Sequence, residues 1–380
     1  MQQDVIHLRR ALRLAARGRY RTSPNPMVGA VLVRDGEIVG EGFHTVVGGP
    51  HAEAEALASA AGTSTTGATL YVTLEPCNHH GRTPPCSELV VASGVRRVVA
   101  CHRDPDPRVA GGGFARLRAA GIEVEEGLLA EEAVRLNWRF LTAMVERRPA
   151  VTLKWAMSMD GRIATASGES QWISSPGGRD WGLDAREEHD AILIGSGTMM
   201  ADDPRLDRRR GRADGTILRV VLDRRLRTPP TARLWDRPGD VVIYTEPTVA
   251  KGLQSPVPLA ERRRALVDRG AEVVELECVE PAAVLADLYQ RRVQSVLVEG
   301  GGTVASAFVE AGLFDRVIVD MAPMLIGGAE ALGPLGGAGI RKLNDAPRLA
   351  ALKFGHRGGD LVIEGFRERC LPDLCAAVAA

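Results

Sequence analysis

Short apolar runs alternate with longer helical patterns along the chain. In the first part, runs typical of strands occupy residues 29–33, 69–73 and 97–101, and helical patterns occupy residues 51–61 and 87–93. Strand-like runs return later in the chain, at residues 151–157, 191–194, 218–222, 241–244, 295–299, 316–320 and 361–364. Strands that alternate with helices predict an α/β fold in both parts.

A break between the two series divides the chain. Residues 131–145 have a helical pattern that ends in Glu146-Arg147-Arg148-Pro149, and the proline disfavours helix at the residue before it. The chain has 380 residues, which at about 100–200 residues per domain predicts two domains. We therefore predict one domain over residues 1–147 and a second over residues 148–380.

The first residues are rich in arginine and poor in acids, which is also typical of organellar transit peptides. Val5, Leu8, Leu12 and Ala15 have helical spacing, however, and Asp4 stands where an N-cap or first-turn acid is expected. We interpret this segment as the first amphipathic helix of the fold.

Composition disfavours polyanion and membrane binding. The 48 basic and 48 acidic residues give a formal net charge of zero, and aromatic residues make up only 4% of the chain. No apolar run approaches the roughly 20 residues of a membrane helix. The six cysteines are scattered, so we expect reduced thiols or metal ligands and a cytoplasmic location rather than a disulfide framework.

Three segments of the first part bring metal-ligating residue types together. His51 and Glu53 open a predicted helix, Cys77 follows a predicted strand, and Cys86 begins another helical run. One imidazole and two thiolates make three zinc ligands and leave the fourth tetrahedral position open for water, whose proton Glu53 can move. Zinc deaminases have such a His-x-Glu and Pro-Cys signature, although the spacing of the two cysteines is longer here. A surface His-Glu pair with two buried thiols is the alternative.

The remaining thiols and several histidines lack such a context, and we interpret them as ordinary core, tail or surface residues. They are Cys101, Cys278, Cys370, Cys375, His7, His102, His189 and His356.

The second part contains a glycine cluster. The predicted strand 295–299 leads into Gly300, Gly301 and Gly302, and a helical pattern follows near residues 304–311. Free backbone N–H groups at such a helix start could hold a dinucleotide phosphate, although a tight turn between strand and helix would use the same residues.

Several ordered motifs extend these signals. In the first half they are Pro24-Asn25-Pro26-Met27-Val28-Gly29, Gly42-Phe43-His44 and the run from Glu75 to Cys86. In the second half they include Ser158-Met159-Asp160-Gly161-Arg162, Ala201-Asp202-Asp203-Pro204 and Val298-Glu299-Gly300-Gly301. From about residue 4 to about residue 366, the chain resembles the family of bifunctional riboflavin biosynthesis proteins.

The resemblance implies two reactions. A zinc-dependent deaminase hydrolyses the 2-amino group of 2,5-diamino-6-(5-phosphoribosylamino)pyrimidin-4(3H)-one. An NADPH-dependent reductase then reduces the ribosyl side chain of 5-amino-6-(5-phosphoribosylamino)uracil to ribityl. The implied folds are a cytidine-deaminase-like α/β/α domain and a dihydrofolate-reductase-like α/β domain, with one zinc ion per chain and NADPH as cofactors. Partners are small phosphorylated pyrimidines, and self-association stays open.

The resemblance also implies site residues. Asn25 and His44 are expected to contact the pyrimidine, although Asn25 between two prolines is also a typical turn residue. His79 and Arg82 are expected to contact the substrate from the loop between the two cysteines. Lys154 and Asp202 are expected to assist proton movement in the reductase. Expected NADPH contacts are Ala156, Trp172, Thr198, Asp202, Gly301, Gly302, Thr303, Val304, Ala305, Ser306 and Ala307. Expected contacts to the ribosylated substrate are Ser170, Arg186, Leu206, Arg209 and Glu299.

Some alternatives stay open. Arg224 and Arg225 follow the predicted strand 218–222 and could bind the 2′-phosphate of NADPH, or they could form an exposed basic turn. A zinc deaminase that acts on a nucleic-acid base would share the first-half signature, but zero net charge and the second half disfavour it. A non-catalytic binding protein would not need Glu53 beside a complete ligand set.

Overall fold

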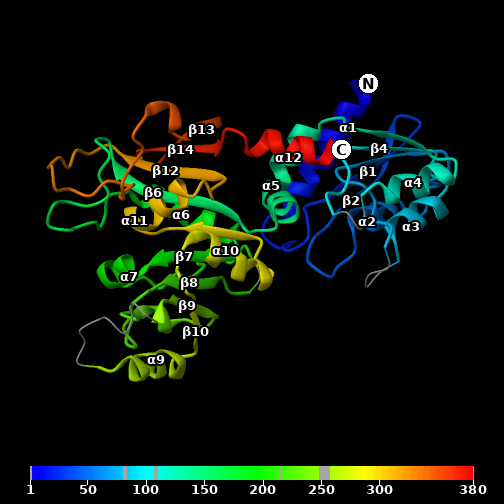
Figure 1. The fold of residues 1–380 in the computed structure, drawn as a ribbon. Coiled ribbons are helices and arrows are strands. Elements are labelled where there is room, and N and C mark those ends of the chain that lie inside the picture. Colours follow the sequence, from blue (N-terminus) through cyan, green and yellow to red (C-terminus); the bar gives the residue numbers. More distant parts are fainter. Residues whose placement is uncertain (1, 80–83, 107–109, 214, 248–256, 380) are drawn as a thin grey trace. The chain divides into compact units, whose positions relative to one another are not determined.

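The computed structural model describes residues 2–79, 84–106, 110–213, 215–247 and 257–379, and the chain forms two compact units. Unit 1 consists of Met1–Arg147 with Leu371–Ala380, and unit 2 consists of Arg148–Cys370 (Figure 1). The C-terminal helix α12 (Cys370–Ala379) therefore groups with unit 1, although the sequence-based division placed it in the second domain. Its buried Leu374 and Val378 explain this, because a short apolar helix needs a core to cover it.

Unit 1 contains a five-stranded sheet with the order β2-β1-β3-β4-β5. The strands are β1 (Gly29–Arg34), β2 (Glu37–Phe43), β3 (Thr69–Val72), β4 (Arg97–Ala100) and β5 (Glu123–Glu126). β1 pairs antiparallel with β2 and β3, whereas β3, β4 and β5 are parallel to one another.

Helices cover both faces of this sheet. The helices are α1 (Gln2–Ala15), α2 (Ala52–Ser59), α3 (Cys86–Ala92), α4 (Gly112–Ala119) and α5 (Ala130–Glu146). Successive residues of β1 point to opposite faces: Ala30 and Leu32 join a core with α2, α3 and α4, whereas Val31 and Val33 join a core with α1 and α5. Unit 1 is thus a three-layer α/β/α sandwich, as expected from the sequence.

Unit 2 contains a nine-stranded sheet with the order β10-β9-β8-β7-β11-β6-β12-β14-β13. The strands are β6 (Ala150–Ser158), β7 (Ala191–Gly195), β8 (Leu218–Leu222), β9 (Val241–Thr245), β10 (Ala271–Glu275), β11 (Ser295–Val298), β12 (Arg316–Ala322), β13 (Leu349–Arg357) and β14 (Asp360–Arg367). The strands from β10 to β12 in this order are parallel, and β14 and β13 complete the sheet antiparallel.

The helices of unit 2 are α6 (Pro176–Glu187), α7 (Ser196–Asp202), α9 (Leu259–Asp268), α10 (Pro281–Gln290) and α11 (Gly302–Glu310). Residues of α10 and α11 share a core with Ala191 and Leu193 of β7, whereas Ile192 and Ile194 face a second core that includes a residue of α9. β11 lies between β6 and β7, so the carboxyl ends of β7 and β11 are neighbours. Ligands bind at such a crevice in open α/β sheets.

Candidate functional site

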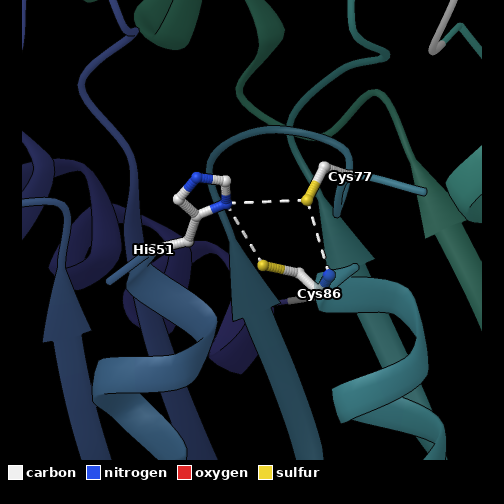
Figure 2. A group of neighbouring side chains, drawn as sticks. All are labelled: His51, Cys77 and Cys86. Carbon is white, nitrogen blue, oxygen red and sulfur yellow. Dashed lines mark hydrogen bonds between the residues drawn. The ribbon is translucent and has the colours of Figure 1, made fainter. Parts of the chain in front are cut away.

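The three predicted zinc ligands converge in unit 1. His51 directly precedes α2, Cys77 follows β3, and Cys86 is the first residue of α3. The Nδ1 atom of His51 lies 3.5 Å from the Sγ atom of Cys77 and 3.3 Å from that of Cys86 (Figure 2). Tetrahedral zinc with bonds of about 2.0–2.3 Å needs ligand atoms about 3.5 Å apart. The donor set and its geometry therefore fit one zinc ion.

The cluster shares its protons unequally. Hydrogen bonds from Cys86 and then from His51 lower the pKa of the Cys77 thiol to about 4, whereas the hydrogen bond with Cys77 and burial raise the pKa of Cys86. Glu53 is buried in the first turn of α2, and burial, with the negative charge of Cys77 as a second cause, raises its pKa to about 7. A carboxyl group with a pKa near neutrality can both accept and return a proton.

Asn25 and His44 lie beside this cluster. The rings of His44 and His51 are edge to face, with centroids 5.5 Å apart, and burial lowers the pKa of His44. The Nδ1 atom of His44 is 2.9 Å from the carbonyl oxygen of Pro50, which can only accept, so Nδ1 carries the proton. The Nε2 atom of His44 can then accept from the Asn25 side-chain amide at 3.1 Å.

Of the two predicted contacts between the cysteines, only one is described. His79 is exposed next to Asn78, whose side-chain oxygen accepts a hydrogen bond from the Ser87 hydroxyl. Arg82 lies outside the described residues.

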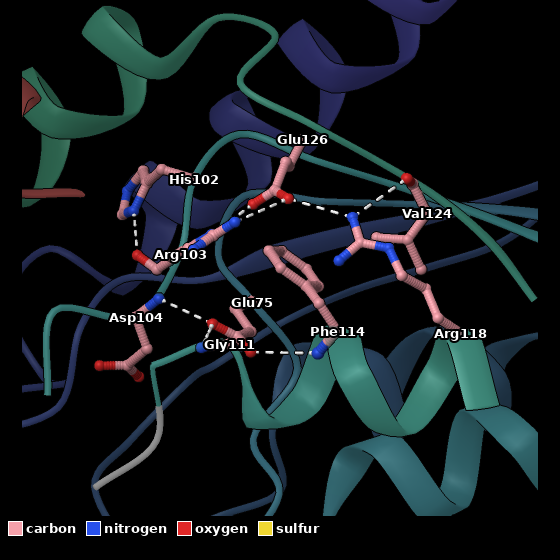
Figure 3. A network of polar contacts seen from close by, with 9 residues as sticks. All are labelled: Glu75, His102, Arg103, Asp104, Gly111, Phe114, Arg118, Val124 and Glu126. Carbon is pink, nitrogen blue, oxygen red and sulfur yellow. Dashed lines mark hydrogen bonds and ion pairs between the residues drawn. The ribbon is translucent and has the colours of Figure 1, made fainter. Parts of the chain in front are cut away.

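Glu75 supports the segment that carries Cys77, a role that the sequence reasoning missed. Its buried carboxylate accepts hydrogen bonds from the backbone N–H groups of Asp104 at 3.2 Å, Gly111 at 3.0 Å and Phe114 at 3.1 Å (Figure 3). The start of α4 also packs tightly on the next residue, because a Cβ atom at Gly113 would lie 1.9 Å from the Pro76 oxygen. The position of Glu75, two residues before the metal-ligating cysteine, was the available signal.

Unit 2 has a cavity of about 400 Å³ where the predicted nucleotide site should be. It lies where β7, β8 and β11 end, and it is lined by the residues that open α7 and α11. Of the predicted NADPH contacts, Thr198, Gly301, Thr303, Val304 and Ala307 line it. The Thr198 hydroxyl accepts a hydrogen bond from the Gly301 N–H at 2.9 Å, which joins the two helix starts.

Other predicted NADPH contacts lie away from this lining. Gly302 packs on the backbone of Gly333 and Gly336, and the Ser306 hydroxyl donates to the Gly336 oxygen. Ala305 is buried. Trp172 is 67% exposed and stacks with the Arg179 guanidinium, 4.8 Å from its ring centroid. Ala156 lies in β6, opposite a residue of β12.

Three arginines line one side of the cavity. Arg224 and Arg225 were predicted there, and Arg227 adds a third cation that the sequence reasoning overlooked in the same loop. Arg224 pairs with Glu246 at 3.1 Å, and Arg227 donates to the Ser196 hydroxyl at 2.8 Å. The buried Asp223 carboxylate holds this loop by accepting the N–H and the hydroxyl of Thr228.

Several predicted substrate contacts of unit 2 meet one another. Two guanidinium nitrogens of Arg186 bind the two carboxylate oxygens of Glu299, at 2.6 and 3.3 Å. Burial opposes charge on Glu299, but the charges of Arg186 and Lys154 outweigh it and lower the Glu299 pKa. The Ser170 hydroxyl donates to Asp202 at 3.0 Å.

Two other predicted contacts are less direct. The Arg209 guanidinium is half exposed and paired with Asp207 at 2.8 Å. The Leu206 side chain is buried in the core with Ile192 and Met199, so only its backbone is left for a ligand.

None of the six cysteines, all of which lie within the described residues, forms a disulfide bond. Among those assigned to ordinary packing, Cys101 and Cys370 are buried, Cys375 is half-buried and Cys278 is exposed. Within the described residues, His51, Cys77 and Cys86 are the only group of three or more potential ligands close enough to share a metal ion. No helix in the described part of the chain is both long and apolar enough to cross a membrane.

Comparisons with known proteins match both units. Residues 149–363 match the RibD C-terminal domain, and residues 1–102 match the cytidine and deoxycytidylate deaminase zinc-binding region. The riboflavin biosynthesis protein RibD of Escherichia coli is 42% identical over 95% of this chain and 98% of its own length. RibD of Bacillus amyloliquefaciens is 43% identical over 94% of this chain and 95% of its own.

Solved structures agree over nearly the whole chain. A form of Acinetobacter baumannii RibD superposes with a TM-score of 0.84 at 39% identity, covering 96% of this chain and 99% of that one. A diaminohydroxyphosphoribosylaminopyrimidine deaminase/5-amino-6-(5-phosphoribosylamino)uracil reductase from Thermotoga maritima gives a TM-score of 0.81 at 35% identity, with the same coverage.

Proposed function

The chain belongs to the RibD family of bifunctional riboflavin biosynthesis proteins, and on this premise we propose which of its residues carry out the two reactions. Unit 1 contains the zinc-dependent deaminase and unit 2 the NADPH-dependent reductase. The substrates that we assign are the phosphoribosylated diaminopyrimidine named above and the uracil that its deamination gives.

In the deaminase, we assign His51, Cys77 and Cys86 as the zinc ligands. A zinc ion held by these residues would supply a Lewis acid, which makes water a nucleophile for the ring carbon that carries the amino group. Glu53 takes a proton from the water and returns it to the departing nitrogen, so that ammonia leaves. The observation that carries this assignment is the buried Glu53 carboxyl group in the same helix turn as His51, beside three converging ligands.

Asn25 and His44 orient the pyrimidine in this proposal. The Asn25 amide group donates to His44, so the Asn25 oxygen is left to accept from an N–H group of the substrate. The backbone N–H of Asn25 also donates to the Thr22 oxygen, so the residue shapes a turn as well. We add His79, which is exposed, and Arg82, which lies outside the described residues, as contacts to the substrate.

In the reductase, we assign the NADPH site to the cavity between α7 and α11. NADPH supplies the hydride when it is bound. Thr198 and Gly301 shape the start of α11 for a phosphate, and Arg224, Arg225 and Arg227 supply cations for the 2′-phosphate. Ser170, Glu299 and the backbone of Leu206 contact the ribosylated substrate, and Arg186 and Arg209 suit its phosphate. Lys154 and Asp202 move the proton at the reduced sugar.

The bifunctional chain allows one experiment with an internal control. Glu53→Gln should keep one zinc ion per chain and full reductase activity but lose deaminase turnover by at least about a hundredfold. Metal analysis and the two steady-state assays measure this. Deaminase turnover near the native value would remove Glu53 from the mechanism.

We also infer self-association of unit 2 and a cytoplasmic location. Leu325, Leu332, Leu343 and Phe354 are each more than half exposed, and Phe354 lies on the edge strand β13. Exposed apolar groups on a strand edge favour pairing with another chain. Sedimentation of the native chain should show a species larger than 40.7 kDa.

The inferred cytoplasmic location agrees with the proposed metal site. A reducing compartment keeps the thiols of Cys77 and Cys86 available as zinc ligands.

A further inference from the structure

Two buried carboxylates lie beneath the start of α6. Asp320 of β12 is 0% exposed, and Asp360, the first residue of β14, is 1% exposed. A Cβ atom at Gly178 would lie 2.3 Å from the Oδ2 atom of Asp320 and 2.3 Å from that of Asp360. The two Oδ2 atoms are therefore separated by no more than twice 2.3 Å. A glycine at this position of α6 makes room for the pair.

The two carboxylates have different partners. Asp360 accepts a hydrogen bond from the backbone N–H of Ser175 at 2.7 Å, just before α6 begins. Within the described residues, neither oxygen of Asp320 has a donor in hydrogen-bond geometry. The groups that act on Asp320 are Asp360, Lys154 and the Ser174 hydroxyl. Burial of a carboxylate without hydrogen-bond donors costs free energy of folding, so this position of Asp320 needs a specific explanation.

The next turn of α6 leads to Lys154. A Cβ atom at Gly182 would lie 3.0 Å from the Lys154 Nζ atom. Gly178 and Gly182 are four residues apart, on one face of the helix and about 6 Å from each other. In the sheet, Asp320 pairs with Ala156, two residues after Lys154, so both side chains point to this same face. The amino group and the buried carboxylate are therefore neighbours.

Glu299 is a second acid near Lys154, and it is already paired with an arginine. The charge of Lys154 helps to lower the pKa of Glu299, but Arg186 already donates hydrogen bonds to both oxygens of that carboxylate. Asp320 differs from Glu299 in that no arginine among the described residues binds its oxygens.

We propose that Asp320, backed by Asp360, is a positioning residue of the reductase: its carboxylate supplies the negative charge that holds the amino group of Lys154 in place. The inference rests on the assignment of Lys154 to proton movement under the proposed function. Asp320 itself touches neither substrate nor cofactor in this arrangement.

The arrangement makes this contact sensitive to pH. Burial and, after it, the charge of Asp360 raise the pKa of Asp320 to about 6, whereas Lys154 and the Ser174 hydroxyl oppose the shift. The carboxylate is thus present well above pH 6 and becomes neutral as the pH falls through that value. The groups that act on the Asp320 carboxylate are Lys154 from β6, Asp360 from β14 and Ser174 before α6.

The first measurement needs no substrate or cofactor. Infrared difference spectra of the full chain, with those of Asp320→Asn subtracted, should show a carboxylic acid that titrates near pH 6. The subtraction removes Asp104, because burial raises the pKa of that carboxyl group to about 6 as well. Asp360→Asn should move this titration to lower pH, because a negative neighbour is lost. Lys154→Met should move it to higher pH, because a positive neighbour is lost. A titration that Lys154→Met leaves in place refutes the proposal.

The second measurement is reductase kinetics against pH. In the native chain, reductase kcat should fall as the pH drops through about 6. Asp320→Asn should lower kcat about ten- to a hundredfold at neutral pH, leave the KM for NADPH within twofold, and remove the change near pH 6. The control Asp268→Asn makes the same chemical change at an exposed residue of α9 and should match the native profile.

The two measurements separate the inference from the proposed function. An Asp320→Asn enzyme with native kcat and an unchanged pH profile refutes the positioning role. If Lys154→Met shifts the Asp320 titration but keeps reductase activity, the charge pair is real and the assignment of Lys154 to proton movement is wrong.

Discussion

Replacement of Glu75 by glutamine tests how the metal segment is held. The Glu75 carboxylate accepts three backbone N–H groups, two on Oε2 and one on Oε1. A glutamine can keep its oxygen on the side of Asp104 and Gly111, but its NH₂ group then faces the Phe114 N–H, which is left without an acceptor. Loss of the charge weakens the two remaining bonds as well, so we expect local destabilisation of about 3 kcal/mol.

Hydrogen–deuterium exchange at the start of α4 measures this loss. About 3 kcal/mol corresponds to roughly a hundredfold faster exchange at Gly111 and Phe114 if these amides exchange by local opening. Because Glu75 directly precedes Pro76 and Cys77, zinc should also leave Glu75→Gln faster than the native protein during chelator challenge.

Glu126→Gln is the matched control from the same network. Glu126 forms ion pairs with Arg103 and Arg118, which are partly exposed, and such pairs contribute less than about 1 kcal/mol (Figure 3). Equal exchange rates in the two variants would refute the idea that Glu75 holds the start of α4.

Three further predictions follow from the assignments. Cys77→Ser or Cys86→Ser should each reduce bound zinc well below one ion per chain in metal analysis; full occupancy in both would reject this ligand set. Arg224→Ala combined with Arg225→Ala should raise the KM for NADPH more than the KM for NADH, and Arg227→Ala should add to this effect. Added salt should reduce the preference of the native chain for NADPH over NADH. An equal rise of KM for both cofactors would contradict a contact to the 2′-phosphate. A chain of residues 148–370 should reduce the deaminated substrate without deaminating its precursor, and a folded fragment that binds no NADPH would show that the units depend on each other.

The pattern of apolar residues predicted the inner strands of both sheets but not the strands at the sheet edges. The strands absent from the sequence-based prediction are β2, β5, β10 and β13, and each lies at an edge of its sheet. Inner parallel strands are covered on both faces and show as continuous apolar runs, as in Ala191–Gly195. β5 reads Glu-Val-Glu-Glu and alternates between exposed and half-buried positions, so no apolar run marks it.

The two sites differed in how much the sequence could show. His51, Glu53, Cys77 and Cys86 belong to residue types with a specific joint chemistry, and their local order along the chain was enough to predict a zinc site. The reductase site is assembled where distant strands end, so Lys154, Asp202 and Glu299 carry no local pattern and came only from the family resemblance. The ion pair between Arg186 and Glu299 could not be predicted either, because it depends on the position of β11 between β6 and β7 in the sheet.

Asp320 did leave a signal in the sequence, and its meaning depended on the fold. The predicted strand 316–320 ends in this acid after three apolar residues, and in a two-residue period Asp320 falls on the same face as Ile318, which is buried. A carboxylate on a covered face of an inner strand is costly unless a cation compensates it, so a functional neighbour should be sought. The strand order supplies that neighbour: β12 pairs directly with β6, which brings Lys154 to the same face. Lys154 and Asp320 are far apart in the sequence, so no local sequence pattern predicts that they are neighbours. The parallel pairing of β6 with β12 brings them together.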